Sequence, residues 1–163
     1  MQELTEKQIR NSFVNASRRE VAQLPLPNDL DTCDWDNLDL LAWSDPRDRR
    51  RSFVVAPARE RVVGFILTST QSNIGKRAMC VWCEDIKETS EVGMFSAKLA
   101  GAAGRKGDTV ATLIHSDFDC SRFVRRQPTP MEGGDDPEQF IETRIARLRE
   151  HLEGFARKVA GLA

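Results

Sequence analysis

The chain has 163 residues, and its 24 basic and 25 acidic side chains give a formal net charge of −1. Its residues are 40% hydrophobic and 30% charged, which excludes wholesale disorder and suits one soluble domain over residues 1–163. No apolar run could cross a bilayer and no signal pattern precedes the first helix, so we expect a cytoplasmic protein without a membrane partner. The balanced charge also argues against electrostatic capture of nucleic acid by the domain as a whole.

Two short helices and an irregular segment are predicted in the amino-terminal part. Residues 5–8 and 17–20 each have the form of a capping box. They predict a helix over residues 6–16 and a shorter one that ends before Pro25. Residues 28–43 are apolar and aromatic without a clean period, which favours packed irregular structure.

An antiparallel sheet is predicted in the middle of the chain. After a charged loop that holds four arginines between residues 47 and 51, two β-branched runs form a hairpin over residues 52–56 and 61–68. Further strands are expected at residues 77–82, 91–98 and 109–114. A glycine-rich basic loop is expected between the last two, over residues 101–108.

The carboxyl-terminal part is predicted to be helical. A short helix is expected at residues 121–126, a loop at 128–136 and a long helix at about 137–160. Apolar residues from Ile141 to Val159 alternate in steps of four and three, so they form one stripe. Docking of this stripe on the sheet is favoured over a dimer seam. Helices at both ends of an antiparallel sheet give an α+β fold.

Two pairs of metal-binding residue types stand out. Cys80 and Cys83 form a CxxC pair, and His115 and Cys120 form a second pair after 31 intervening residues. Three thiolates and one imidazole complete a tetrahedral zinc set with no open position, which indicates one structural ion rather than a catalytic one. The order of strand, knuckle, strand and helix is that of a treble clef, with a zinc lobe over about residues 77–127.

Other interpretations of these residues stay open. CxxC is also typical of redox dithiols, although no βαβ pattern surrounds this one. A treble clef could also serve a nuclease-like reaction with His115 as base, yet a histidine bound to zinc cannot act so, and we predict no catalytic residues. Asp117 and Asp119 are second-choice ligands in place of His115. Cys33 is expected to be a buried small hydrophobic residue.

The chain resembles a known family in several stretches. These are residues 9–17, residues 35–43, the Cys80 and Cys83 knuckle, residues 107–121 and residues 123–125. They are similar to the FBP domain, the treble-clef zinc-finger domain that binds elongation factor G and forms the C-terminal part of FusB-type fusidic acid resistance proteins. In that family the position of His115 is usually cysteine.

The resemblance implies a zinc-stabilised binding module without a small-molecule substrate. Its implied partner is translation elongation factor G, which it would help to leave a stalled ribosome, and direct ribosome or RNA binding is the alternative. From the residues themselves, Arg122, Arg125, Arg126 and Lys106 are candidates for a basic partner-binding face, and ordinary solvated charges are the competing interpretation.

Aromatic and histidine residues outside this set are assigned to the core or the surface. Trp35 and Trp43 are expected in the core, Trp82 in the core or at an interface, and His151 on the exposed side of the last helix.

Overall fold

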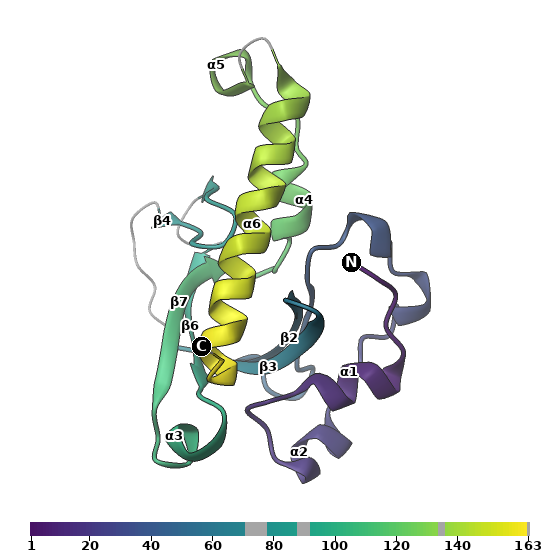
Figure 1. The fold of residues 1–163 in the computed structure, drawn as a ribbon, viewed down its shortest axis with the longest axis vertical. Coiled ribbons are helices and arrows are strands. Elements are labelled where there is room, and N and C mark those ends of the chain that lie inside the picture. The colour runs from purple at the N-terminus through teal and green to yellow at the C-terminus, as the bar shows by residue number, and fades with distance from the viewer. Residues whose placement is uncertain (71–77, 88–91, 134–135, 163) are drawn as a thin grey trace.

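A computed structural model of the chain describes residues 1–70, 78–87, 92–133 and 136–162. Its centre is a five-stranded antiparallel sheet in the order β1-β2-β3-β6-β7 (Figure 1). The strands are β1 (Leu41–Ser44), β2 (Arg51–Ala58), β3 (Arg61–Ser69), β6 (Val92–Lys98) and β7 (Thr109–His115). Two further strands, β4 (Ala78–Met79) and β5 (Ile86–Lys87), form a separate small hairpin.

Helices lie before, between and after the strands, which confirms the predicted α+β class. They are α1 (Glu6–Ser12), α2 (Arg18–Gln23), α3 (Gly101–Arg105), α4 (Cys120–Val124), α5 (Pro130–Gly133) and α6 (Pro137–Ala160). Two single 3-10 turns, η1 (Leu30–Thr32) and η2 (Trp35–Asn37), occupy the segment predicted to be irregular. Both predicted capping boxes are present, at Thr5 and at Ser17. Among the described residues, no helix has the length and apolar character needed to span a membrane.

The first helix ends four residues earlier than predicted. Phe13 is extended and forms a bridge with Gly64 of β3, and the amide of Val14 donates to the Gly64 carbonyl at 2.9 Å. The chain can approach β3 this closely because Gly64 has no side chain. A Cβ there would lie 2.4 Å from Ser12 Oγ.

Other boundaries also differ from the sequence-based expectation. Residues 41–44 form an edge strand, since they pair with β2 through four residue pairs. Residues 101–105 form a short helix that begins at Gly101, with a left-handed φ of 68°, and residues 130–133 form one helical turn. The strand predicted at 77–82 is reduced to β4, because the chain turns at Cys80; residues 77 and 91 lie outside the described part of the chain.

Two hydrophobic layers cover the two faces of the sheet. Successive residues of a strand point to opposite faces, and the buried residues of β2 divide accordingly. Val54 and Ala56 pack in the larger cluster, which contains α6, whereas Val55 packs in a smaller one with Ile9 of α1. Figure 1 shows α6 running across the sheet, and it shows α1 and α2 lying apart from α6.

Helix α6 docks on the sheet as predicted. Leu148, Leu152 and Val159 are buried, and Phe155 packs against Phe65 of β3 with ring centroids 5.5 Å apart. The helix starts at an Asp136 cap and ends at Gly161, whose φ of 66° is left-handed. The apolar stripe is therefore a core element.

In the described part of the sheet, the hairpins β2–β3 and β6–β7 are joined to each other by few residue pairs. Strands β2 and β3 pair over eight residue pairs and β6 and β7 over seven. Between β3 and β6, only Thr68 with Ser96 and Ser69 with Phe95 pair among the described residues. The half made of β6 and β7 supports the side chains described next.

Candidate metal centre

The first pair of candidate ligands lies in a tight turn between β4 and β5. The amide of Cys80 donates to the carbonyl of Asp85 at 3.0 Å, and the amide of Glu84 donates to the carbonyl of Cys80 at 2.9 Å. Glu84 has a left-handed φ of 56°, which allows the turn to close. Both cysteine side chains are buried as a result.

The second pair lies where β7 meets α4. His115 is the last residue of β7 and Cys120 the first of α4, as the sequence indicated. The turn between them places Phe118 at a left-handed φ of 60°. The amide of Val81 donates to the carbonyl of Leu113 at 2.8 Å, so the first turn is fixed directly against β7.

These two turns bring Cys80, Cys83, His115 and Cys120 together in one buried cluster, with ligand atoms within 4.8 Å of one another. The Sγ atoms of Cys80 and Cys120 are 3.7 Å apart. The Nδ1 atom of His115 is 3.4 Å from Cys83 Sγ and 3.8 Å from Cys120 Sγ. A tetrahedral zinc ion with ordinary bond lengths requires sulfur–sulfur edges of about 3.8 Å and sulfur–nitrogen edges of about 3.5 Å. The cluster therefore fits one zinc ion.

The imidazole of His115 is oriented by packing. The residue is fully buried, and its ring lies 4.7 Å from the Phe123 ring, at an angle of 55°. Its Nδ1 atom faces the sulfurs, whereas Nε2 is buried without a hydrogen-bond partner among the described residues. Metal-bound histidines usually donate their second N–H to an oxygen. Here Nε2 has no such oxygen among the described residues, so the orientation of the ring depends on packing.

The three thiols cannot all ionise without a cation among them. Hydrogen bonds with Cys120 and Cys83 lower the pKa of Cys80 well below its ordinary value. The pKa of Cys83 is lowered by its hydrogen bond with Cys120, but its contact with Cys80 and burial raise it to about 12. The contacts with Cys80 and Cys83, together with burial, raise the pKa of Cys120. A bound dication would displace the remaining protons.

A buried carboxylate connects α4 to the rest of the protein. Asp39 is 2% exposed and lies between η2 and β1. Its Oδ2 atom is 2.5 Å from Arg125 Nη1, and its Oδ1 atom accepts from Arg149 Nε at 2.8 Å. Its amide donates to Ser121 Oγ at 2.9 Å. Sequence reasoning missed this role, although an aspartate inside an otherwise apolar run, between Leu38 and Leu40, was a signal.

A second link joins α6 to the turn of the first pair. His151 is half-buried, with Nδ1 3.1 Å from the carbonyl oxygen of Trp82. Arg147 donates to Glu84 at 3.0 Å. The expectation that His151 is exposed is therefore wrong. Trp82 is 1% exposed and packs in the core against Phe155.

The predicted basic face is divided by the structure. Lys106 caps α3 at one end of the protein, whereas α4 lies well away from it beside the middle of α6 and, with the residues just after it, carries the arginines (Figure 1). Each of those arginines has an acidic partner. Arg122 pairs with Asp119 at 2.6 Å, Arg126 with Glu132 at 2.6 Å and with Asp85 at 3.7 Å, and Arg125 with Asp39. Their charge is therefore largely neutralised where the sequence suggested a positive surface.

The remaining candidates are placed as follows. Asp117 accepts the amide of Asp119 at 3.1 Å, and both lie outside the buried cluster. Trp35 and Trp43 are half-buried and pack at the edge of the smaller core cluster. Cys33 is half-buried there too, and burial raises the pKa of its thiol.

Comparison with protein families identifies the fold that carries this cluster. The model of the FBP C-terminal treble-clef zinc-finger matches residues 8–159, nearly the whole chain. This chain belongs to that family. The FBP resemblance seen in the sequence is confirmed, and a zinc-finger family agrees with the zinc expected at the buried cluster.

A solved structure supports the same fold. "Structure of the fusidic acid resistance protein FusC" matches with a TM-score of 0.55 and 16% sequence identity, over 75% of this chain and 53% of that one. At this identity the match establishes the fold, and this FBP chain spans about half the length of the FusC structure. The comparison with curated proteins gives no match.

Proposed function

We propose that Cys80, Cys83, His115 and Cys120 bind one structural zinc ion. The distances of 3.4 to 3.8 Å among their ligand atoms support this assignment. When bound, the ion would cross-link the β4–β5 turn to the junction of β7 and α4. Structural zinc contributes about 10 to 16 kcal/mol of apparent binding energy, comparable to the whole stability of a domain. The metal-free protein is therefore expected to lose its structure around this centre.

The second part of the proposal is that this chain binds translation elongation factor G and promotes its release from the ribosome. Membership of the FBP family over residues 8–159 carries this proposal. The zinc ion has a supporting role, because four protein ligands leave no position for a substrate. The module therefore acts by binding and not by catalysis, in the cytoplasm. Fusidic acid resistance is a property of FusC, the longer protein, and is not part of this proposal.

A redox role for Cys80 and Cys83 is the competing function. A redox dithiol needs two sulfurs that reach each other, and it does not need a third thiol and an imidazole in the same buried cluster. Full burial of His115 and Cys120 beside the pair favours the metal.

Two measurements test the proposal. Elemental analysis of untagged protein should find one zinc per chain, and the metal should be lost or weakened in Cys83→Ser and His115→Ala variants. Cys33→Ser is the matched control, because Cys33 lies outside the cluster, and it should retain the metal. No metal, together with a Cys80–Cys83 disulfide, would instead support the redox function.

Purified zinc-loaded protein should then capture elongation factor G in a pull-down. Addition of the protein should also shorten the residence of the factor on ribosomes stalled by fusidic acid. Failure of capture by zinc-loaded wild-type protein contradicts the binding function without affecting the zinc assignment.

A further inference from the structure

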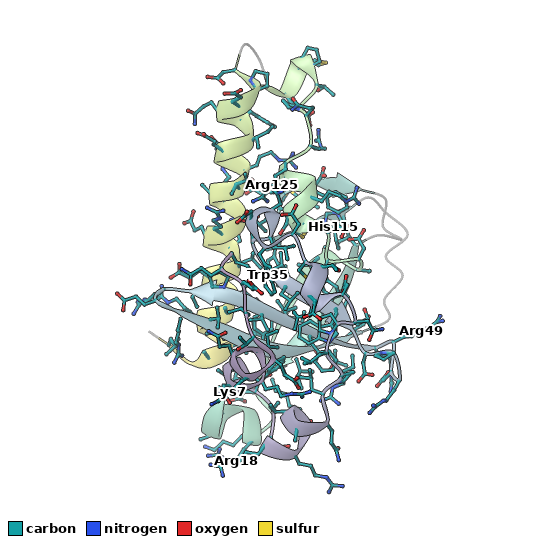
Figure 2. The ribbon with its side chains drawn as sticks, turned by 90° about the vertical axis from the view of Figure 1, so that its right-hand side faces the viewer. Lys7, Arg18, Trp35, Arg49, His115 and Arg125 are labelled. Carbon is teal, nitrogen blue, oxygen red and sulfur yellow. The ribbon has the colours of Figure 1, made fainter. Side chains whose placement is uncertain are left out.

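A second charged surface lies away from the metal centre. It consists of seven basic residues from three parts of the chain, which we call the basic end. They are Arg18 and Arg19 of α2, Arg47, Arg49 and Arg50 between β1 and β2 with Arg51 at the start of β2, and Lys98 at the end of β6. Figure 2 shows Arg18 and Arg49 projecting outward from the half of the protein that holds α2, away from His115.

Contacts between the three parts show that they lie side by side. Arg51 Nη2 is 3.4 Å from Glu20 Oε1, which joins the start of β2 to α2. Asn15 Nδ2 donates to the carbonyl of Lys98 at 3.0 Å, which places the end of β6 beside the entry to α2. Hydrogen bonds from Ser17 lower the pKa of Glu20, and the nearby charges of Arg51 and Lys98 lower it further.

Most of the charge on this surface has no internal partner. The side chains of Arg18, Arg19, Arg47 and Arg49 make no ion pair or hydrogen bond with any part of the chain that the structure describes. All four are exposed. This differs from the arginines of α4, each of which is paired with a carboxylate.

The acidic residues of the loop fix its backbone and leave Arg47 and Arg49 unpaired, while Asp48 also contacts Arg50 Nε at 3.4 Å. Asp45 is 6% exposed and accepts the amide of Arg47 at 2.9 Å. Asp48 accepts the amide of Arg50 at 3.0 Å. The hydrogen bonds of Asp45 and Asp48 therefore hold the loop backbone in one conformation, from which the guanidinium groups project.

The chemistry of the surface favours a phosphate polymer as its partner. Six of its seven cations are arginines, whose planar guanidinium groups bind phosphate through two parallel hydrogen bonds. Protein interfaces and membrane surfaces usually require an exposed apolar anchor. In the part of the chain that the structure describes, the exposed large hydrophobic side chains are Met79, Val81 and Met131, and none belongs to the basic end.

The lack of exposed aromatic side chains at this surface favours a double-stranded over a single-stranded nucleic acid as its partner. Single strands are bound by stacking of bases on exposed aromatic rings, whereas double helices are held through their phosphates. The nearest aromatic groups, Phe53 and Trp43, are buried or half-buried, and the guanidinium of Arg51 lies over Phe53 at 5.4 Å. The basic end can therefore contact a backbone but cannot stack bases.

We propose that the basic end binds the phosphate backbone of double-helical RNA independently of its sequence. The choice of RNA rests on the proposed function at the ribosome, while the surface itself does not use the metal centre. The four unpaired arginines would contact about four phosphates. This would give the module a contact with RNA on the half of the protein opposite its metal centre.

The test measures binding of a fluorescent RNA duplex of about 16 base pairs to the zinc-loaded full chain. The variant R18Q/R19Q/R47Q/R49Q removes the unpaired charges, and R122Q/R126Q is the control beside the metal centre. Because the four substituted side chains make no ion pair or hydrogen bond with the described residues, the variant should keep wild-type circular dichroism and zinc content. Wild-type affinity should fall about a hundredfold between 50 and 200 mM salt, and that of the variant less than about tenfold.

Several outcomes would overturn the proposal. They are no binding of the duplex by wild-type protein at about 50 mM salt, equal affinity of wild type and the four-arginine variant, or a larger loss in the R122Q/R126Q control. Tighter binding of a DNA duplex, or of anionic phospholipid vesicles through the same arginines, would assign the surface to a different partner.

Capture of elongation factor G by the same proteins separates this proposal from the proposed function. The four-arginine variant should capture the factor as wild type does. If wild-type protein binds the RNA duplex but captures no factor, the proposed function fails and the RNA surface stands. If wild-type protein captures the factor but does not bind the RNA duplex, the RNA surface fails and the proposed function stands.

Discussion

Substitution of Asp39 by asparagine tests whether this buried carboxylate organises the helix that follows the metal centre. The Asp39 side chain is fully buried, whereas Arg125 and Arg149 retain 20% and 60% of their side-chain exposure. The contact with Arg125 is worth about 2 kcal/mol as a charge-assisted hydrogen bond. The exposed Arg149 adds no more than about 1 kcal/mol. We therefore expect Asp39→Asn to lower the free energy of unfolding by about 3 kcal/mol.

The assay is urea denaturation at a fixed excess of zinc, followed by tryptophan fluorescence. For a chain of this length, the loss corresponds to a fall in Tm of roughly 6 to 12 °C. Arg149→Gln is the matched control and should cost about 1 kcal/mol or less. In the double variant with Arg125→Gln, the two effects should be less than additive, because both remove the same contact.

The same substitution should also weaken zinc binding. The Asp39 carboxylate contacts Arg125, which directly follows α4, whereas the bond from the backbone amide of residue 39 to Ser121 would remain in the variant. Removal of a ligand's own hydrogen-bond partner commonly costs about tenfold or more in metal affinity. Asp39 acts one contact further away, through Arg125, so we expect a smaller loss, which a chelator competition would measure. A loss of stability below about 1 kcal/mol together with unchanged zinc affinity would refute this reasoning.

Three further predictions concern the core and the metal. Gly64→Ala should lower the free energy of unfolding in urea by about 1 to 3 kcal/mol, because the new Cβ would lie 2.4 Å from Ser12 Oγ. If adding Ser12→Ala to this variant recovers none of the loss, the packing explanation is contradicted. Leu152→Ala should cost about 3 kcal/mol, since Leu152 is 1% exposed, and a loss under about 1 kcal/mol would argue against docking of α6. Zinc affinity in chelator competition should rise with pH by about a hundredfold per unit between about pH 6 and 8, since Cys83, with a pKa of about 12, and Cys120, with a raised pKa, each release a proton; a pH-independent affinity would contradict this.

The elements with strong local signals were predictable from the sequence. The capping boxes at Thr5 and Ser17, the β2–β3 hairpin and the stripe of α6 each depend on residues close together in the chain. The metal cluster was also predictable, because paired cysteine and histidine residues have a narrow chemical use. Such signals need no knowledge of the tertiary fold.

Features that depend on distant contacts were not predictable in the same way. The early end of α1 results from the close approach of residues 12–14 to Gly64. The neutralisation of the α4 arginines depends on partners such as Asp39, 86 positions away from Arg125. The sequence gives the sign of each charged side chain. The electrostatic potential at a surface also depends on which oppositely charged residues the fold brings next to it.

The narrow pairing between β3 and β6 has a consequence for motion. Among the described residues, two pairs join the hairpins β2–β3 and β6–β7, while eight and seven pairs hold each hairpin together. Helix α6 contacts β2, β3 and β7, so it acts as a strut across this seam. We expect the amide proton of Thr70, which donates to the Met94 carbonyl across the seam at 2.9 Å, to exchange through partial opening, and those inside each hairpin only through global unfolding. The seam is therefore the place where we expect the sheet to open first, against the resistance of α6, while both hairpins stay intact.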